Sequence, residues 1–128
     1  MRIEYANTFL EVTGQNEEII QILPTEIINF NLENKFTDIR GLTKSGKVVI
    51  IEGHVGILND QHLIRYYGYH KDTFCDFSKE IKFIIACLSK GKNQKRLMAE
   101  ENICFKPIVL ELKKIKADKY LNKLRTKF

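Results

Sequence analysis

The segment Lys47–Glu52 constrains the fold more than any other part of the chain. It reads Lys-Val-Val-Ile-Ile-Glu, so four β-branched apolar residues follow one another without a polar break. A strand with one solvated face alternates apolar and polar residues, whereas a strand covered on both faces does not. We therefore expect a central strand with helices on both sides of its sheet, which is the α/β class.

Two further strands are expected before this one, and a helix after it. The turn signal Lys44-Ser45-Gly46-Lys47 joins the second strand to the third. Asn59 or Asp60 is expected to cap a helix over Gln61–His70. The three strands of the predicted meander are Ile27–Leu32, Phe36–Leu42 and Lys47–Val55.

The remaining segments extend this pattern. A short helix is predicted over Asn16–Leu23, because Asn16 can cap it and acidic residues follow in its first turn. The other predicted elements are a buried strand over Ile81–Leu88, a helix over Gln94–Glu101, a strand over Cys104–Leu112 in which Pro107 favours an edge or a bulge, and an amphipathic helix over Lys113–Lys127. The result is one domain, 1–128, with a mixed sheet flanked by helices.

Charge is divided unevenly along the chain. Residues 1–78 have a balance of −4 and residues 79–128 a balance of +9. This division suits a metal-dependent enzyme that acts on a polyanion, and it also suits lysine-rich helices with solvated faces. Because no stretch of about 18 apolar residues and no apolar leader occur, we expect a cytoplasmic protein without a membrane segment. Three widely spaced cysteines without a C-x-x-C motif predict free thiols.

Two carboxylates stand out by their place in the predicted hairpin. Asp38 is early in the second strand, and Glu52 ends the apolar run of the third. In antiparallel neighbours the start of one strand lies beside the end of the next, so these side chains can meet across about 5 Å. Mg²⁺ or Mn²⁺ suits such a pair, since it keeps waters and substrate phosphate as its other ligands. The alternative is a structural pair neutralised by Arg40, Lys47 or Arg65.

These residues resemble the signature of the PD-(D/E)XK nuclease superfamily, in which Asp at the start of one strand is followed by Glu-x-Lys on the next. Here the signature reads Thr37-Asp38 and then Glu52-Gly53-His54. With Arg65-Tyr66-Tyr67 on the following helix, the likeness is nearest to the recombination-promoting nuclease and transposase-like group, over roughly residues 24–88. The resemblance implies a restriction-endonuclease-like fold and a metal-dependent endonuclease that hydrolyses DNA phosphodiester bonds.

Carried over residue by residue, the resemblance makes Asp38 and Glu52 metal ligands, with the carbonyl oxygen of Gly53 as a third. His54 takes the position of the lysine or glutamine near the attacking water. A lysine there carries a fixed positive charge, whereas the charge of a histidine depends on its surroundings. His54 would then act as a general base, or the site would be inactive.

Further candidates lie on the predicted helices. Gln61 and Arg65 are four residues apart and share a helix face, from which both would contact a scissile phosphate. An equal alternative for Arg65 is an ion pair that only stabilises the fold. Glu17 or Glu18 would be an additional metal ligand or would serve the helix dipole. Three histidines recur at intervals of eight residues and match no zinc-ligand spacing: His54, His62 and His70.

The competing function is a catalytically inactive protein of the same fold. It would bind nucleic acid or a partner protein through its basic C-terminal half. A homodimer is a further expectation, because two active sites would address the two strands of a duplex. A third possibility is an interaction subunit that dimerises through an edge strand.

Overall fold

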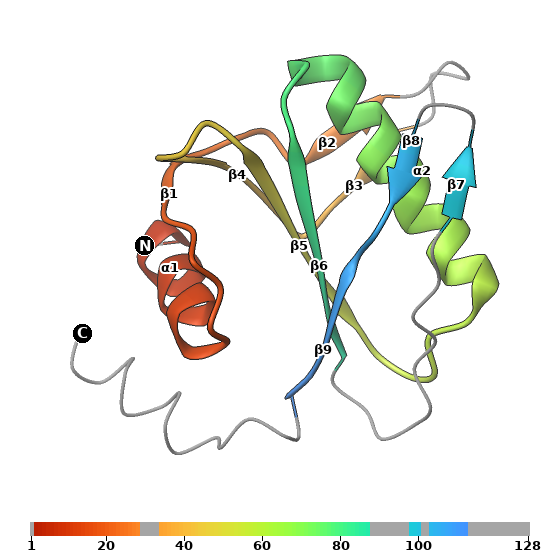
Figure 1. The fold of residues 1–128 in the computed structure, drawn as a ribbon, viewed down its shortest axis with the longest axis horizontal. Coiled ribbons are helices and arrows are strands. Elements are labelled where there is room, and N and C mark those ends of the chain that lie inside the picture. Colours follow the sequence, from red (N-terminus) through yellow and green to blue (C-terminus); the bar gives the residue numbers. More distant parts are fainter. Residues whose placement is uncertain (1, 29–33, 88–97, 101–102, 113–128) are drawn as a thin grey trace.

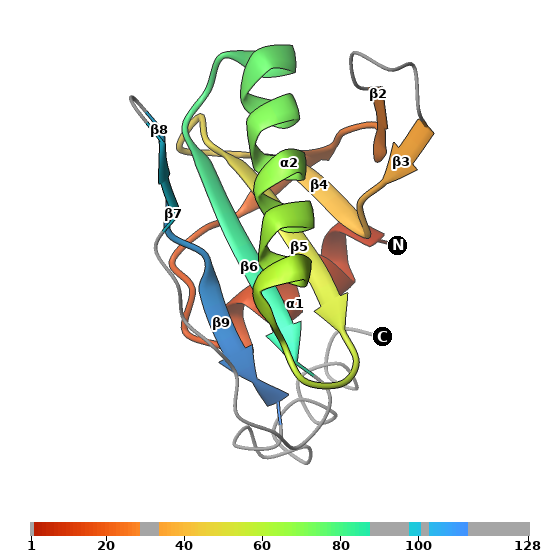
Figure 2. The same ribbon diagram turned by 90° about the vertical axis from the view of Figure 1, so that its right-hand side faces the viewer.

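The computed structural model describes residues 2–28, 34–87, 98–100 and 103–112 (Figure 1). Its centre is a five-stranded mixed sheet with the strand order β1-β4-β5-β6-β9. These strands are β1 Ile19–Ile22, β4 Ile39–Thr43, β5 Val48–His54, β6 Ile81–Cys87 and β9 Ile108–Glu111, and the helices are α1 Arg2–Val12 and α2 Asp60–Phe77. Figures 1 and 2 show α1 against one face of the sheet and α2 against the other, which confirms the α/β class.

Three antiparallel strands and a crossover helix build this sheet. β4 pairs antiparallel with both β1 and β5, and β5 is followed by α2, which leads to β6 parallel to β5. β9 then adds to β6 in parallel. A meander followed by a helical crossover was predicted, but its first strand is Ile19–Ile22 and not Ile27–Leu32.

β5 is the central strand that its sequence predicts. Its residues from Val48 to Glu52 are buried, and it lies between β4 and β6. Val48 and Ile50 pack in the core beneath α2, whereas Val49 and Ile51 pack in a second core beneath α1. A strand buried on both faces has no position at which water can solvate a side chain, which explains the unbroken apolar run.

Helix α2 begins where the sequence predicts and continues beyond the predicted end. Asn59 is the N-cap, and its side chain accepts a hydrogen bond from the backbone of His62, whose ring in turn accepts one from the backbone of Asn59. This reciprocal capping box satisfies two backbone donors of the first turn. The helix ends at Phe77 because Ser78 takes a left-handed conformation with φ of 52°.

The N-terminal region corrects the prediction. The segment 19–22 is a strand and not part of a helix over Asn16–Leu23, and the helix is α1, which the sequence did not predict. The β-branched residues of β1 gain ladder bonds from β4, and Gly41 lets Ile19 approach closely. A Cβ atom at Gly41 would lie 2.7 Å from the Ile19 side chain. Tertiary pairing therefore outweighs the local capping signal.

Two small hairpins lie outside the central sheet. β2 Glu26–Ile28 pairs with β3 Asn34–Phe36, and β7 Met98–Glu100 pairs with β8 Ile103–Phe105. The predicted strand Phe36–Leu42 is thus divided between β3 and β4. Only the beginning of the predicted strand Ile27–Leu32 lies within the described residues.

The C-terminal predictions are met in part. The predicted helix Gln94–Glu101 is wrong where the structure describes it, because 98–100 form β7. The predicted strand Cys104–Leu112 is two strands interrupted at Pro107, and β9 is an edge strand of the central sheet, as that proline favoured. The predicted helix Lys113–Lys127 lies outside the described residues.

Arg40 fixes α2 over the sheet. Its guanidinium is buried, with 2 % of the residue exposed. Its Nε donates to the Pro24 carbonyl at 2.7 Å and its Nη1 to the Thr73 hydroxyl at 3.1 Å, and the Asp76 carboxylate lies 3.5 Å from Nη1. One side chain of β4 thus ties the chain before β2 to the second half of α2.

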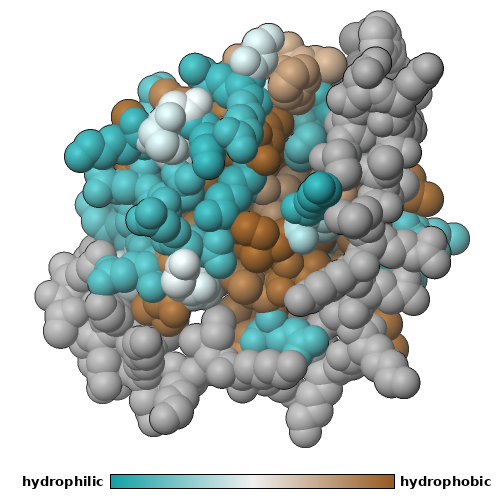
Figure 3. All heavy atoms as spheres, in the orientation of Figure 1, coloured by the Kyte–Doolittle hydropathy of each residue, from teal (hydrophilic) through white to brown (hydrophobic). Residues whose placement is uncertain are grey.

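The surface is divided by polarity. In Figure 3 hydrophilic side chains cover the part of the surface over α1, and apolar side chains gather in the middle, where β9 lies in Figure 1. Ile108, Val109 and Leu110 of β9 are half-buried. Among the described residues, no helix combines the length and the apolar character needed to cross a membrane.

Candidate functional site

The β4–β5 hairpin brings Asp38 and Glu52 together. Ile39 is paired with Ile51, so Asp38, the residue before β4, stands opposite Glu52. The backbone N–H of Asp38 donates to Glu52 Oε1 at 3.1 Å, and the backbone N–H of Gly53 donates to Asp38 Oδ2 at 2.7 Å. Each carboxylate therefore accepts a hydrogen bond from the backbone of the opposite strand. This juxtaposition is the one that the hairpin spacing predicts.

Glu52 is a buried carboxylate with a perturbed pKa. Only 5 % of the residue is exposed, and burial raises its pKa from 4.5 to about 7. The Thr37 hydroxyl, which donates to Oε1, acts in the opposite direction, and repulsion by the Asp38 carboxylate raises the pKa further. A buried carboxylate beside a second carboxylate favours either a proton or a cation.

No ion pair neutralises these two acids within the described part of the chain. Arg40 is held by Pro24 and α2. Lys47 lies at the far end of the hairpin, 3.5 Å from Glu17. Arg65 lowers the pKa of Glu52 through its charge but forms no ion pair with it among these residues. Within the described residues, Asp38 and Glu52 are therefore not a structural pair neutralised by a basic side chain.

Gly53 keeps space beside Asp38. A Cβ atom at this position would lie 3.3 Å from Asp38 Oδ2, which is tighter than ordinary van der Waals contact. Gly53 itself is exposed. The glycine thus lets the Asp38 carboxylate accept a hydrogen bond from the Gly53 backbone N–H.

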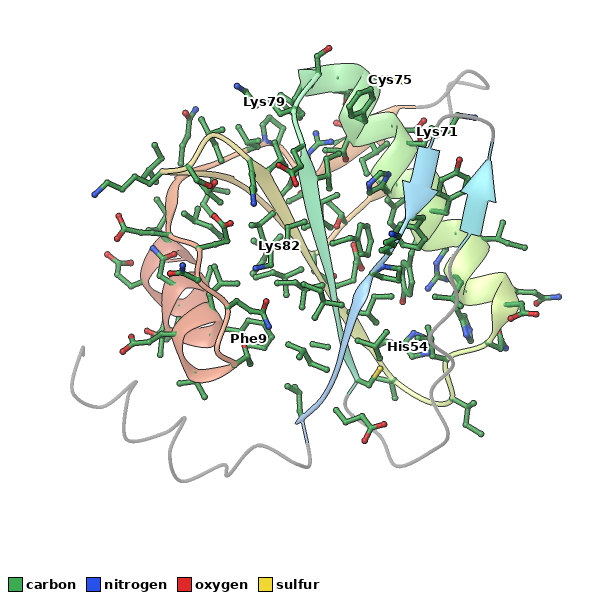
Figure 4. All side chains as sticks on the ribbon, viewed as in Figure 1. Phe9, His54, Lys71, Cys75, Lys79 and Lys82 are labelled. Atoms are coloured by element: carbon green, nitrogen blue, oxygen red, sulfur yellow. The ribbon has the colours of Figure 1, made fainter. Side chains whose placement is uncertain are left out.

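His54 follows on β5 and contacts α2. It is 4 % exposed, and its Nδ1 lies 2.9 Å from the Tyr66 hydroxyl. Burial lowers its pKa; the nearby Ile57 carbonyl opposes this, and the charges of His62 and Arg65 lower it further. Nε2 is buried and makes no hydrogen bond to any described residue. Figure 4 shows His54 at the carboxyl end of β5, on the side where α2 begins.

Arg65 reaches back towards this site from α2. Its Nη2 donates to the Tyr66 hydroxyl at 3.1 Å, and its guanidinium carbon lies 4.9 Å from the centre of the Tyr66 ring. The residue is exposed. Gln61, four residues earlier, is also exposed, and within the described ranges it forms no hydrogen bond with Asp38 or Glu52.

Two tyrosines of α2, Tyr66 and Tyr69, belong to the surroundings of the site. Tyr66 bridges His54 and Arg65, as described above. Burial raises the pKa of Tyr69; the charge of Arg65 opposes this, and the Glu52 and Asp38 carboxylates raise it further. Both carboxylates therefore contribute to the electrostatic surroundings of Tyr69. The spacing of Arg65 and Tyr69, four apart on one helix face, is the signal that marks Tyr69.

The other two histidines, His62 and His70, pack against neighbouring aromatic rings. The His62 ring packs edge-on against His54, with ring centres 4.5 Å apart, and serves the capping box. His70 packs against Tyr67 and Phe105. In the ranges that the structure describes, no three His, Cys, Asp or Glu side chains are grouped to hold a metal ion. A cation at Asp38 and Glu52 would thus have two carboxylate ligands and complete its shell with backbone oxygen, water or substrate.

A hollow of about 640 Å³ lies at the opposite end of the hairpin. It is lined by residues of α1, the following loop and the Lys44-Ser45 turn, and Glu17 and Glu18 are among them. Glu17 accepts a hydrogen bond from Ser45 and pairs with Lys47. Its charge is therefore compensated, and neither Glu17 nor Glu18 is brought to Asp38, so we place the candidate chemistry at Asp38 and Glu52 instead.

The site combines three chemical properties. It has two adjacent carboxylates without a paired base among the described residues, a backbone N–H that orients one of them, and a cationic side chain on the neighbouring helix. Hard oxygen ligands of this kind bind Mg²⁺ or Mn²⁺, and a guanidinium binds phosphate.

Comparison of the chain with models of known families, with curated proteins and with solved structures yields no match.

Proposed function

We propose that the protein is a metal-dependent endonuclease of the PD-(D/E)XK type that hydrolyses DNA phosphodiester bonds. The observation that carries the proposal is the pair of adjacent carboxylates, Asp38 and Glu52, for which no basic partner lies among the described residues. A buried carboxylate is costly unless a proton, a base or a cation compensates it. A divalent cation satisfies both acids at once.

The order of the elements supports this fold type. A helix, a three-strand antiparallel meander, a crossover helix and a parallel strand occur in this order as α1, β1, β4, β5, α2 and β6, with the β2–β3 hairpin inserted between β1 and β4. This agrees with the restriction-endonuclease-like arrangement that the Thr37-Asp38 and Glu52-Gly53-His54 motifs imply. Asp38 precedes the second strand of the meander and Glu52 lies on the third, as the signature requires.

In this proposal Asp38, Glu52 and the Gly53 carbonyl hold Mg²⁺ or Mn²⁺. The bound cation would lower the pKa of a water and stabilise charge on the phosphate. Thr37 and the Asp38 backbone fix Glu52 Oε1 by hydrogen bonds, so the carboxylate is oriented before substrate binds. The basic balance of residues 79–128 supports a polyanionic substrate.

Calorimetric titration with Mn²⁺, combined with cleavage of plasmid DNA, tests the proposal. The wild-type protein should bind Mn²⁺ and nick the plasmid. Asp38→Asn and Glu52→Gln should abolish both properties. Glu80→Gln is the matched control, because Glu80 is exposed and lies 3.9 Å from Lys47 at the other end of the hairpin.

The outcomes separate the two candidate functions. Mn²⁺ binding that depends on Asp38, together with cleavage, supports the nuclease. DNA retention without Mn²⁺ heat and without cleavage would support an inactive protein of this fold that only binds nucleic acid.

A further inference from the structure

The resemblance places a lysine or a glutamine two residues after the metal-binding glutamate, and this chain has His54 there. A lysine would contribute a positive charge near the phosphate. The His54 ring is 4 % exposed and packs against Tyr66 and His62, so it does not reach a phosphate in this geometry. A positive charge at this site would therefore come from another element.

Arg65 is the described cation that reaches this region. Its Nη2 donates to the Tyr66 hydroxyl at 3.1 Å, so its guanidinium is folded back over the Tyr66 ring. Arg40 is buried beneath α2 and occupied by Pro24 and Thr73. Lys71 and Lys79 lie towards the other end of α2 in Figure 4.

One hydrogen-bond direction in this group follows from its donors and acceptors. A guanidinium has donors only, so the Tyr66 oxygen accepts from Arg65. The Tyr66 hydroxyl also lies 2.9 Å from His54 Nδ1, and the tautomer of the ring decides which of these two atoms donates. In either case the hydroxyl bridges the His54 ring and the Arg65 guanidinium.

We propose that Arg65 supplies from α2 the positive charge that the signature places on β5, and that Tyr66 and His54 are positioning residues that hold its guanidinium at the metal site. The proposal rests on the proposed nuclease function. Tyr66 is 2 % exposed and His54 lies on the central strand, so the row of contacts from His54 through Tyr66 to Arg65 begins at two buried side chains. Arg65 is exposed at its outer end and keeps donors for a phosphate oxygen.

Single-turnover cleavage of DNA and calorimetric Mn²⁺ titration test this assignment. Arg65→Gln should lower kcat by about 100-fold, as expected when one preorganised donor to a developing charge is lost. Its Mn²⁺ Kd should stay unchanged or become tighter, because a cation near the carboxylates has been removed. Arg65→Lys should keep more activity than Arg65→Gln. Lys71→Gln, on the same helix, is the matched control and should leave both quantities unchanged.

Two further variants test the positioning residues. Tyr66→Phe keeps the ring and the Arg65 charge but removes the bridging hydroxyl, so kcat should fall about 10-fold while the Mn²⁺ Kd stays unchanged. In the double variant Arg65→Gln, His54→Lys, a cation returns to the position of the signature. This variant should recover at least about 10-fold of the activity that Arg65→Gln loses, as expected if one charge serves from either element.

The possible failures are distinguishable. If wild-type protein does not cleave, the nuclease proposal fails and this one with it. If wild-type cleaves and Arg65→Gln retains kcat within about twofold, only the assignment of Arg65 is overturned. A parallel loss of Mn²⁺ binding and kcat in Arg65→Gln or Tyr66→Phe would also overturn it, because it would indicate a merely structural role. These single variants decide the matter even if the His54→Lys change does not fold.

Discussion

Two buried charged residues of the hairpin differ in how they are compensated. Arg40 is surrounded by the Pro24 carbonyl, the Thr73 hydroxyl and the Asp76 carboxylate. Glu52 has hydrogen bonds from Thr37 and the Asp38 backbone, and its nearest charged neighbour across the hairpin is the like-charged Asp38. The first arrangement stabilises the fold, whereas the second stores an unfavourable charge that a ligand can relieve.

Replacing Arg40 should therefore destabilise the protein strongly. Arg40→Met leaves the Pro24 carbonyl and the Thr73 hydroxyl without their donor and removes the partner of Asp76. We expect a loss of about 3 kcal/mol in the free energy of unfolding, measured by urea denaturation. Lys71→Met, an exposed change on α2, should stay within about 0.5 kcal/mol of wild type. A loss below about 1 kcal/mol for Arg40→Met would contradict the role of Arg40 in holding α2 over the sheet.

The raised pKa of Glu52 predicts a pH dependence of stability. The folded protein binds this proton up to about pH 7, whereas the unfolded chain releases it near pH 4.5. Between these values the folded state holds more protons, so the free energy of unfolding should fall as pH rises, by about 2 to 3 kcal/mol. Glu52→Gln should lack this fall.

Denaturation of both proteins in EDTA at several pH values gives the measurement. The difference between wild type and Glu52→Gln is the relevant quantity, because burial lowers the pKa of His54 and His70 and makes them act in the opposite sense near neutral pH. Parallel curves for the two proteins from pH 4.5 to 7.5 would refute a raised Glu52 pKa.

Among the elements, β5 and α2 are predictable from the sequence and β1 is not. Local pattern alone identifies β5 by its apolar run and α2 by its Asn59 cap. β1 consists of β-branched residues that follow Asn16 and two glutamates, which resemble the start of a helix. Its strand conformation comes from pairing with β4 across Gly41, a contact between residues distant in sequence.

That close approach predicts opposite effects for two glycine substitutions. Gly41→Ala places a Cβ 2.7 Å from the Ile19 side chain, so it should separate β1 from β4 and cost about 1 to 3 kcal/mol. Gly68→Ala, in the interior of α2 with open space around the new Cβ, should stabilise by about 0.5 to 1 kcal/mol. Thermal unfolding of the pair measures both, and a neutral Gly41→Ala would show that β1 tolerates displacement.

For the whole molecule, the candidate site was more predictable than the layers around it. The hairpin spacing was enough to place Asp38 beside Glu52, because a turn of known length fixes which residues face each other. The sequence did not reveal the Tyr66 bridge, since that contact depends on how α2 is docked on the sheet. The sequence also did not predict α1, and it therefore did not predict the second core that α1 forms with the sheet.

Because the two acids belong to neighbouring strands of the central sheet, cation binding should stabilise the entire domain. At a Mn²⁺ concentration of 100 times its Kd, the free energy of unfolding should rise by about 2.7 kcal/mol. At one fixed Mn²⁺ concentration the rise should be larger at pH 8 than at pH 6, since binding requires Glu52 to lose its proton and the Kd is therefore weaker at pH 6. Denaturation with and without Mn²⁺ measures this. Asp38→Asn should show no rise, and Glu80→Gln should match wild type.

The turn between β4 and β5 reverses the chain and also sets the register of the two strands. Hydrogen bonds between Thr43 and Lys47 close it, and Gly46 adopts a φ of 89° within it. One residue more or fewer here would set Asp38 opposite Ile51 or Gly53, and it would also turn Arg40 to the opposite face of the sheet, away from Pro24 and Thr73. The length of this turn therefore fixes two features at once, the adjacency of the two acids and the attachment of α2 to the sheet, and an insertion or deletion of a single residue would cost the protein both.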